Sequence, residues 1–310
     1  IIYVSHRLDE VFQIADRAVV MRNGRVVADK HLKDLAKQEL VSLIVGKEVL
    51  DTQFEEPSQK AQLFLRDFKT NGAGPLTLDL YEGEVIAFCG LRGAGQDEIG
   101  RAIAGVNPFH TGEIKTSQGT LSYESVSSAV KLGIGFSTSN RETEAIAPGL
   151  SVRENLFLNP LLWGRKLLSF QSGGKEKSTA IPHLRKFGVR PEDPELSLDT
   201  LSGGNQQKVI LARWFGLAYK IIVLEEPTMG VDIGAKADIY NLFKAATNEG
   251  TSIIIVSTDL EEVVRVANRA VVFFQGKVVK IVEKEEITYK NLISLASNLA
   301  TADHSGGSHE

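Results

Sequence analysis

Residues 201–208 read LSGGNQQK, and a little further along the chain residues 220–232 read KIIVLEEPTMGVD. The first stretch predicts the start of a helix, because Ser is a favoured N-cap residue. The second begins as a continuous apolar, β-branched run, which is typical of a buried strand, and this run ends at Glu225 and Glu226. Polar and acidic groups are therefore expected at the start of a helix and at the end of a buried strand.

A glycine-rich loop lies upstream of both stretches. Residues 90–97 read GLRGAGQD and stand between a predicted buried strand and a predicted helix. Glycines let backbone N–H groups converge on phosphate oxygens, and a helix N-terminus adds positive potential. Gly90 and Gly95 fit the glycine frame of the P-loop pattern G-x-x-x-x-G-K-[ST], but Gln96 stands at the Lys position. Taken alone, the loop is equally compatible with a structural strand-to-helix turn.

Predicted strands and helices alternate along most of the chain. Apolar runs and alternating patterns predict strands over residues 76–80, 84–89, 133–137, 220–224 and 251–257. Helices are expected between them, and the last one is expected to end near residue 299. This alternation predicts an α/β domain with a largely parallel sheet.

The glycine frame, LSGGNQQK and EEPTMGVD, in this order and spacing, resemble the nucleotide-binding domain of ATP-binding cassette proteins. The resemblance covers residues from about 61 to 300, and LSGGNQQK is a very specific string. The sequence is most similar to the second cassette of tandem ATPases that drive bacterial sugar importers of the ribose, galactose and xylose type; residues 133–136 (GIGF) and 151–156 (SVRENL) also look like that family. The resemblance implies a P-loop, a RecA-like core and a helical subdomain over about residues 140–215.

The first 27 residues of the chain are repeated near its end. Residues 1–27 and 253–279 align without a gap, 252 positions apart, and 15 of the 27 positions are identical. This distance is too long for a solenoid unit and about right for one large domain. We therefore expect residues 1–56 to be the C-terminal remnant of a first cassette plus a linker. Residues 61–300 are expected to be the second cassette, and residues 301–310 a disordered tail.

The N-terminal segment has its own predicted elements. The apolar run at residues 1–4 predicts a buried strand, so the chain looks as if it begins inside a strand. The Asn-Gly pair at residues 23–24 predicts a hairpin turn, and a helix is expected from about residue 32 to 45. The apolar faces of this segment need cover. It is expected to pack on the intact cassette, to drive dimerisation or to be poorly ordered.

In the family that the chain resembles, ATP lies between two cassettes. The P-loop, Walker B strand and switch His of one cassette face the LSGG signature of the other. The resemblance implies that Ser202, Gly203 and Gly204 bind the γ-phosphate of ATP held by the first cassette, and Gln206 is placed with them. It implies that Asp232 links the two sites across the interface. An ordinary Ser N-cap and an ordinary turn acid are the alternatives.

This cassette's own site departs from the family pattern. Glu226 matches the catalytic Glu that polarises water. Glu225 stands where the family has Asp, so Mg²⁺ binding through water is expected from a side chain one methylene longer. Thr258 aligns with His6 through the repeat, which implies that the first cassette keeps its switch His and this one has lost it. Residues 138–140 (TSN) stand where the family tends to have Pro-Glu-Asp.

The P-loop of this cassette also departs from the family pattern. The residues expected to contact the nucleotide are Gly90, Gly93, Gly95, Gln96 and Asp97. Gln96 removes the positive charge that would lie on the phosphates, and Asp97 replaces the Mg²⁺-binding hydroxyl. A helix dipole favours an acid in the first turn by about 0.3–1 kcal/mol, but negative charge at this place would repel ATP. No motif places the adenine-stacking aromatic, and Phe68 is the candidate.

The departures predict an asymmetric pair of sites. Those at Gln96, Asp97, Glu225 and Thr258 all belong to this cassette's own site, whereas the signature and Asp232 serve the partner's. We expect a degenerate own site and a competent site built on the signature, with ATP and Mg²⁺ as cofactors. The full-length protein is expected to be a transport-coupled ATP hydrolase, and this chain alone to be weakly active or inactive.

Composition restricts the partners. The net charge of −4 and the lack of a basic patch argue against nucleic acid. Cys89 is the only cysteine, so no intrachain disulfide forms and a reducing compartment is favoured. No apolar run approaches the ~20 residues that a membrane span needs. The implied partners are the first cassette of the same chain, transmembrane permease subunits and, indirectly, a periplasmic sugar-binding protein, at the cytoplasmic face of the inner membrane.

Two other interpretations stay open. A non-catalytic regulatory or scaffold cassette would use the fold only for dimerisation, and Gln96, Asp97 and Thr258 favour it for this half. A cassette that acts on nucleic acid or ribosomes is opposed by the acidic balance. The signature and Glu226 favour the transporter.

Overall fold

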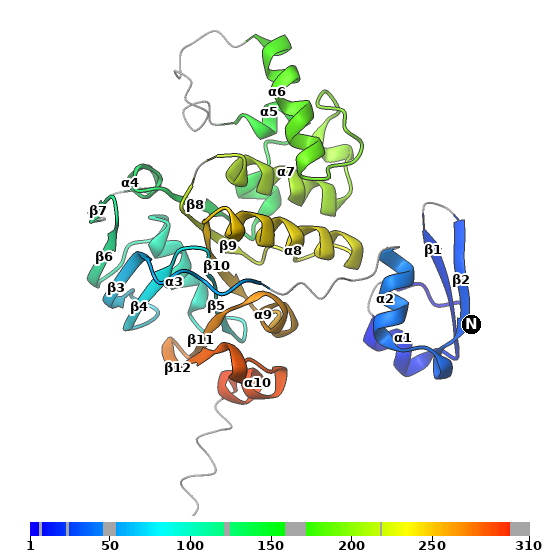
Figure 1. Ribbon diagram of the computed structural model, residues 1–310, viewed down its shortest axis with the longest axis horizontal. Helices are drawn as coiled ribbons and strands as arrows, with labels where there is room; N and C mark the ends of the chain where they lie inside the picture. Colours follow the sequence, from blue (N-terminus) through cyan, green and yellow to red (C-terminus); the bar gives the residue numbers. More distant parts are fainter. Residues whose placement is uncertain are drawn as a thin grey trace, which may run out of the picture.

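A six-stranded sheet lies at the centre of the protein, with helices on both faces, a second sheet and a separate N-terminal segment around it (Figure 1). The computed structural model describes residues 1–5, 8–22, 25–45, 54–120, 125–158, 172–217 and 219–297.

The central sheet has the strand order β12-β11-β5-β10-β9-β8, and all neighbours are parallel except the β11–β12 hairpin. Its strands are β5 (Val85–Gly90), β8 (Ile134–Ser137), β9 (Ile221–Glu225), β10 (Ser252–Ser257), β11 (Arg269–Phe274) and β12 (Lys277–Glu283). Ile254 of β10 pairs with Ile86 on one side and Val223 on the other. Apolar runs of this kind are typical of parallel strands covered on both faces, so the predicted α/β class is confirmed.

Helices on each face of the sheet bury alternate residues of its strands. They are α3 (Gln96–Ile103), α8 (Ile233–Asn248), α9 (Leu260–Val266) and α10 (Tyr289–Ala296). Ile255 of β10 joins the apolar cluster of α8, whereas Ile254 joins that of α3. Side-chain caps fix three helix starts, because Asp232, Asp259 and Thr288 accept backbone N–H bonds in the first turns of α8, α9 and α10.

A four-stranded antiparallel sheet of order β4-β3-β6-β7 packs against the α3 side. Its strands are β3 (Ala61–Lys69), β4 (Leu76–Tyr81), β6 (Thr111–Thr116) and β7 (Gly119–Thr120), and helix α4 (Val126–Lys131) follows. The sequence pattern predicted only the strand over residues 76–80. The pairing register of β3 shifts between Leu65 and Phe68, so its buried residues do not alternate and the strand signal is lost.

A group of helices encloses an apolar core of its own. It contains the π-turn η2 (Arg141–Ala145), α5 (Val152–Leu156), α6 (Gly173–Lys186), the 3₁₀ turn η4 (Leu198–Thr200) and α7 (Gly203–Phe215). Ser151 and Glu154 form a capping box at the start of α5. The buried Arg213 of α7 donates to the carbonyls of Asn155 (3.0 Å) and Ala145 (2.9 Å), and burial lowers its pKa to about 10.

The N-terminal segment is a helix, a hairpin and a second helix. Its elements are α1 (Leu8–Ile14), β1 (Arg17–Arg22), β2 (Arg25–His31), the 3₁₀ turn η1 (Leu32–Asp34) and α2 (Lys37–Val45). The antiparallel pairing of β1 with β2 agrees with the predicted hairpin, whose turn at residues 23–24 lies outside the described residues. The predicted helix begins at Lys37, later than expected. Ile233 of α8 packs against the apolar cluster of this segment, which includes Leu8 and Leu40.

The prediction of a buried strand at residues 1–4 is wrong. Residues 1–5 have no regular structure, and Ile1, Ile2 and Val4 are exposed. Their counterpart in the repeat is β10, which pairs with β5 on one side and β9 on the other. No described strand pairs with residues 1–4, and an apolar run without such partners does not form a sheet. At the other end, α10 stops at Ala296, earlier than predicted, and the predicted tail lies outside the described residues.

The two copies of the repeat place the same arginine in different surroundings. Arg269 of β11 donates its Nε to Oε1 of Glu84 at 2.6 Å and its Nη2 to Oε2 at 3.0 Å, and the Glu84 carboxylate is fully buried. Its counterpart Arg17 pairs with Asp29 across the exposed hairpin. One arginine therefore neutralises a buried charge, and the other makes a surface contact.

Arg269→Ala is expected to lower the free energy of unfolding by about 3–5 kcal/mol, because it leaves the Glu84 carboxylate buried without its partner. The matched change Arg17→Ala is expected to leave stability nearly unchanged, since exposed ion pairs contribute little. Urea denaturation followed by circular dichroism measures both. Equal losses for the two variants would contradict the prediction.

Candidate functional site

The glycine-rich loop connects β5 to α3 at the carboxyl edge of the central sheet. Gly95 has a φ of 104° and is the N-cap of α3. A Cβ on it would lie 2.9 Å from the Cβ of Ala73 and 3.1 Å from the Cα of Gly276, so only glycine fits. Gly90 ends β5, and Gly93 has a φ of 78°. The loop thus presents the N-terminus of α3 at this edge, where the helix dipole favours an anion.

Gln96 turns its side chain back into this loop. Its Nε2 donates to the Leu91 carbonyl at 3.2 Å, and the side chain is only 3% exposed. Its Oε1 has no hydrogen-bond partner among the described residues. Asp97 follows in the first turn of α3 and is exposed. The position of the P-loop Lys therefore holds a neutral, buried amide with an acid beside it.

An arginine of α3 holds Glu225 at the end of β9. The Nε of Arg101 donates to Oε1 of Glu225 at 2.7 Å, and its Nη2 donates to Oε2 at 2.9 Å. The backbone N–H of Ser139 donates to Oε2 at 3.2 Å. The Glu225 side chain is 3% exposed, so this bidentate, charge-assisted pair is shielded from water on the carboxylate side.

Arg101 also belongs to a wider charged network. Its Nη2 donates to Oγ1 of Thr138 at 3.2 Å and to Oε2 of Glu144 at 3.3 Å. Burial lowers the pKa of Arg101, but the hydrogen bonds and charges of Glu225 and Glu144 outweigh it and hold the pKa above its usual value. A hydrogen bond from Thr138 is the main reason that the pKa of Glu144 lies below its usual range. Arg101 and Glu144 therefore stay ionised at neutral pH.

These residues do not fit a Mg²⁺ site in this arrangement. Mg²⁺ prefers octahedral oxygen ligands, usually one or two carboxylates together with substrate phosphates. Both oxygens of Glu225 accept hydrogen bonds from Arg101, and Gln96 and Asp97 offer no hydroxyl. Among the described ranges, no group of three or more His, Cys, Asp or Glu side chains could hold a metal ion.

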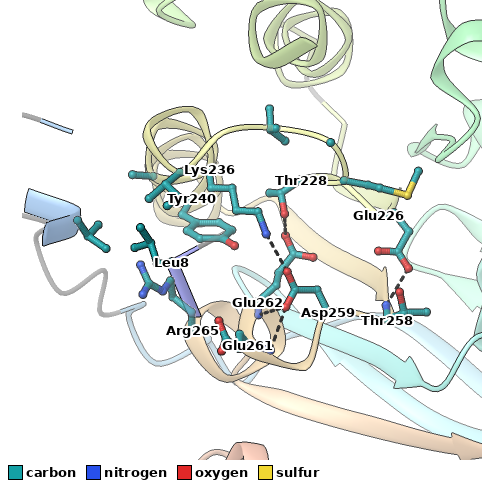
Figure 2. A pocket seen from close by; sticks show the side chains of 16 residues that line it. Leu8, Glu226, Thr228, Lys236, Tyr240, Thr258, Asp259, Glu261, Glu262 and Arg265 are labelled. Atoms are coloured by element: carbon teal, nitrogen blue, oxygen red, sulfur yellow. Dashed lines mark hydrogen bonds and ion pairs between the residues drawn. The ribbon is translucent and has the colours of Figure 1, made fainter. Parts of the chain in front are cut away.

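Glu226 and Thr258 lie together where β9 and β10 end (Figure 2). Glu226 has a φ of 42°, and its N–H donates to the Val256 carbonyl at 2.8 Å. Its Oε1 accepts the backbone N–H of Thr258 at 2.8 Å. The parallel register of β9 and β10 brings these two predicted positions together, but Thr258 has no imidazole. The other predicted residue, His6, lies outside the described residues.

A pocket of about 610 Å³ opens between this end of the sheet and the N-terminal segment (Figure 2). It is lined by α8, α9 and the loop after β9, with Leu8 and Val41 from the N-terminal segment. Glu262 is buried there and accepts hydrogen bonds from the hydroxyls of Thr228 and Ser257, both at 2.8 Å. Burial raises the pKa of Glu262 to about 7. The Glu262 carboxyl therefore titrates near neutral pH.

The LSGG stretch forms the N-terminus of α7. Ser202 is the exposed N-cap residue, and its Oγ accepts the Nδ2 of Asn205 at 3.0 Å. Gly204 lets α7 lie close to α8, because a Cβ there would be 2.6 Å from the Cβ of Ala235. The predicted helix start at the signature is present.

Other predicted residues of the signature region also make contacts within the chain. The Nε2 of Gln206 donates to the Leu201 carbonyl at 3.2 Å, and Arg141 donates to the Gly203 carbonyl at 3.2 Å. Asp232 is exposed and caps α8 through its Oδ1. Asp232 therefore acts as a helix cap, whereas Ser202 stands at the N-cap position of α7 without a side-chain bond to the first backbone N–H groups. The ligand roles of these residues stay predictions.

The structure thus places the predicted residues of the two sites in two groups, at the carboxyl edge of the sheet and at the starts of α7 and α8. The candidate for adenine stacking, Phe68, is wrong: it is fully buried, and its ring centroid lies 5.0 Å from that of Phe109 in the core. Arg101 and Glu262 were not indicated by the sequence, because charged helix residues are ordinarily solvated.

Comparison with known proteins defines the class. The sequence profile of the family described as ABC transporter matches residues 73–229. The chain therefore belongs to the ABC transporter family, and its α/β fold is that of the ATPase cassette. No helix among the described residues is long and apolar enough to cross a membrane.

Among particular relatives, the ribose import ATP-binding protein RbsA of Lactococcus lactis subsp. cremoris is 36% identical over 304 residues, which cover 96% of this chain and 61% of that protein. The ribose import ATP-binding protein RbsA 3 of Rubrobacter xylanophilus is 34% identical over 302 residues, 96% of this chain and 60% of that protein. The chain thus spans about three fifths of the length of the curated relatives it matches.

Two solved ATP-binding cassettes share the fold. One is a dimeric cassette in a post-hydrolysis state bound to ADP and Pi, with a TM-score of 0.61 and 22% identity over 72% of this chain and 98% of that chain. The other is an ABC transporter cassette in its ADP conformation, with a TM-score of 0.63 and 21% identity over 80% of this chain and 100% of that chain. These matches confirm the predicted cassette fold.

Glu262→Gln is expected to remove a pH dependence of stability. The folded-state pKa of about 7 lies above the value of about 4.3 for an unfolded Glu, so this group's stabilisation is present below pH 4.3 and is lost as pH rises through 7. From pH 5 to 8, the free energy of unfolding of the wild type should therefore fall by about 3 kcal/mol relative to the variant. Urea denaturation of both proteins across this range measures the difference. If the difference in free energy of unfolding between the two proteins did not change with pH, Glu262 would not be the group that titrates near pH 7.

Proposed function

We propose that this chain is the ATP-binding, energy-coupling part of a sugar importer, and that it supplies the signature to a site on a partner cassette. The observation that carries the proposal is a contrast between two helix N-termini. Helix α7 begins with an exposed Ser202 followed by two glycines, whereas α3 begins with the buried amide of Gln96 and with Asp97. The ribose import relatives support sugar as the transported substrate.

In this proposal, the cassette's own site is degenerate. Gln96 brings no charge to the phosphates and bonds within its own loop. Glu225 is bound to Arg101, and Thr258 offers a backbone N–H to Glu226 but no imidazole. A site of this composition lacks the charge, the metal ligand and the switch residue that phosphoryl transfer uses, even though Glu226 stands at the catalytic position.

The competent site is proposed to form in trans. The hydroxyl of Ser202 and the first N–H groups of α7, at Gly203 and Gly204, would bind the γ-phosphate of ATP held by a first cassette, at the positive end of a helix dipole. Asp232, exposed at the start of α8, would link the two sites. That first cassette would supply the P-loop and bind Mg²⁺, and His6 would be its switch residue.

Exposed surface in the N-terminal segment supports a remnant of a first cassette. Val19 of β1 is 52% exposed and Met21 is 63% exposed, whereas their counterparts in the repeat, Val271 and Phe273, are fully buried. In the central sheet β11 lies between β12 and β5, whereas the only described strand that pairs with β1 is β2.

We propose that a strand and helices of a first cassette cover this surface. The proposed division is a remnant and linker over residues 1–56, a second cassette over residues 61–300 with a helical subdomain over about 140–215, and a tail over residues 301–310.

The partners follow from the importer proposal. Permease subunits would supply the membrane spans, with a periplasmic sugar-binding protein acting through them. The cassettes would lie at the cytoplasmic face of the inner membrane. Support comes from relatives named as import ATP-binding proteins. A second candidate, a scaffold cassette used only for dimerisation, is favoured by Gln96 and by the Arg101–Glu225 pair.

The chain itself is expected to bind a non-hydrolysable ATP analogue more weakly than micromolar, with or without Mg²⁺. Restoring the P-loop with Gln96→Lys and Asp97→Ser should tighten binding roughly tenfold or more, because it adds a cation and removes an acid at the phosphates. Isothermal titration calorimetry measures both proteins. Micromolar, Mg²⁺-dependent binding by the wild type would contradict the degenerate site.

In a tandem protein that contains the first cassette, Ser202→Ala is expected to lower ATP turnover roughly tenfold or more, because it removes a γ-phosphate donor. Glu226→Gln is expected to leave most of the turnover, and the chain alone is expected to be nearly inactive. Coupled-enzyme assays of phosphate release measure these rates. Unchanged turnover after Ser202→Ala would favour the scaffold cassette. Turnover by the chain alone that Glu226→Gln abolishes would refute the asymmetric pair.

A further inference from the structure

We propose that Arg101 takes the place of a divalent cation at this cassette's own site, so that a guanidinium, and not Mg²⁺, neutralises Glu225. This inference rests on the proposed function, in which the site is degenerate. It adds that the Arg101 guanidinium supplies the positive charge beside Glu225, so that this site needs no metal ion.

The geometry of the pair occupies the carboxylate. Arg101 reaches both oxygens of Glu225, at 2.7 and 2.9 Å, and the N–H of Ser139 adds a third donor at 3.2 Å. A carboxylate has about four lone-pair positions, so most of its acceptor capacity is taken. At 3% exposure the remaining surface is too small for the water shell that Mg²⁺ usually keeps.

The length of the Glu225 side chain matters for this contact. An Asp at the same position would withdraw the carboxylate by roughly 1.5 Å, the length of one C–C bond. The 2.7 Å contact with Nε would then exceed hydrogen-bond range. The hydrogen-bonded contact therefore needs both the longer acid at position 225 and the arginine at position 101.

The surroundings of Arg101 hold the guanidinium in place. Thr138 and Glu144 accept its Nη2 at 3.2 and 3.3 Å, and its Cζ lies 5.8 Å from the ring centroid of Phe136. Glu225 and Glu144 thus face the same cation from two elements. Without the guanidinium, two carboxylates and a hydroxyl would remain around one space, and these are the oxygen ligands that a divalent cation prefers.

Mn²⁺ without nucleotide is the probe that tests the proposal, with free Mn²⁺ followed by electron paramagnetic resonance. We expect Mn²⁺ binding by the wild type to be unaffected by Glu225→Gln. Arg101→Gln should create a site that binds Mn²⁺ roughly tenfold or more tightly than the wild type, because two carboxylates lose their cation. Arg101→Lys retains a positive charge and should bind Mn²⁺ as the wild type does.

The matched control is Arg101→Gln combined with Glu225→Gln, which should lose the gain in Mn²⁺ affinity. Circular dichroism checks that each variant is folded. A folded Arg101→Gln variant without the gain would overturn the proposal. The proposal would also be overturned if the wild type bound Mn²⁺ and Glu225→Gln abolished that binding. This comparison tests the proposal even if the Arg101 variant does not fold. Micromolar ATP binding by the wild type without metal would refute the degenerate site and leave the role of Arg101 standing.

Discussion

The parallel pairing of β5, β9 and β10 is the constraint on which the candidate site depends. Because these strands run in one direction and are buried on both faces, their carboxyl ends meet at one edge of the sheet. The glycine loop after β5, the two carboxylates at the end of β9 and Thr258 after β10 are therefore neighbours, although they lie far apart in the sequence. The neutral Gln96 and the Glu225 carboxylate bound by Arg101 therefore lie in one small region.

The repeat shows that the environment, and not the sequence of a segment, determines its burial. β1 and β11 have closely similar sequences, yet Val271 lies in the core between β5 and β12 while Val19 faces outward. Arg17 and Arg269 differ in the same way, since only Arg269 has a buried carboxylate within reach. Without described strands beside it of the kind that flank β10 and β11, the N-terminal segment forms the hairpin but no strand at residues 1–4.

Much of the fold was predictable because its signals are local. The continuous apolar runs at residues 84–89 and 251–257 were found as strands, and the Ser at position 202 was found as a helix start. The structure of β3 was not predictable, since a shift in pairing register hides its alternation. The contact between Arg101 and Glu225 joins residues 124 positions apart, and no pattern along the chain encodes it. The burial of Phe68 likewise follows from the packing of the second sheet against α3.

The close approach of α7 and α8 at Gly204 has a mechanical consequence. There is no clearance between the helices at this point, because even a methyl group on Gly204 would overlap with Ala235. A displacement of the first turn of α7 towards α8 would therefore require α8 to move as well. Helix α8 in turn bears on the N-terminal segment through Ile233, next to its start. The first turn of α7, the start of α8 and the N-terminal cluster around Leu8 thus form one continuous packed path.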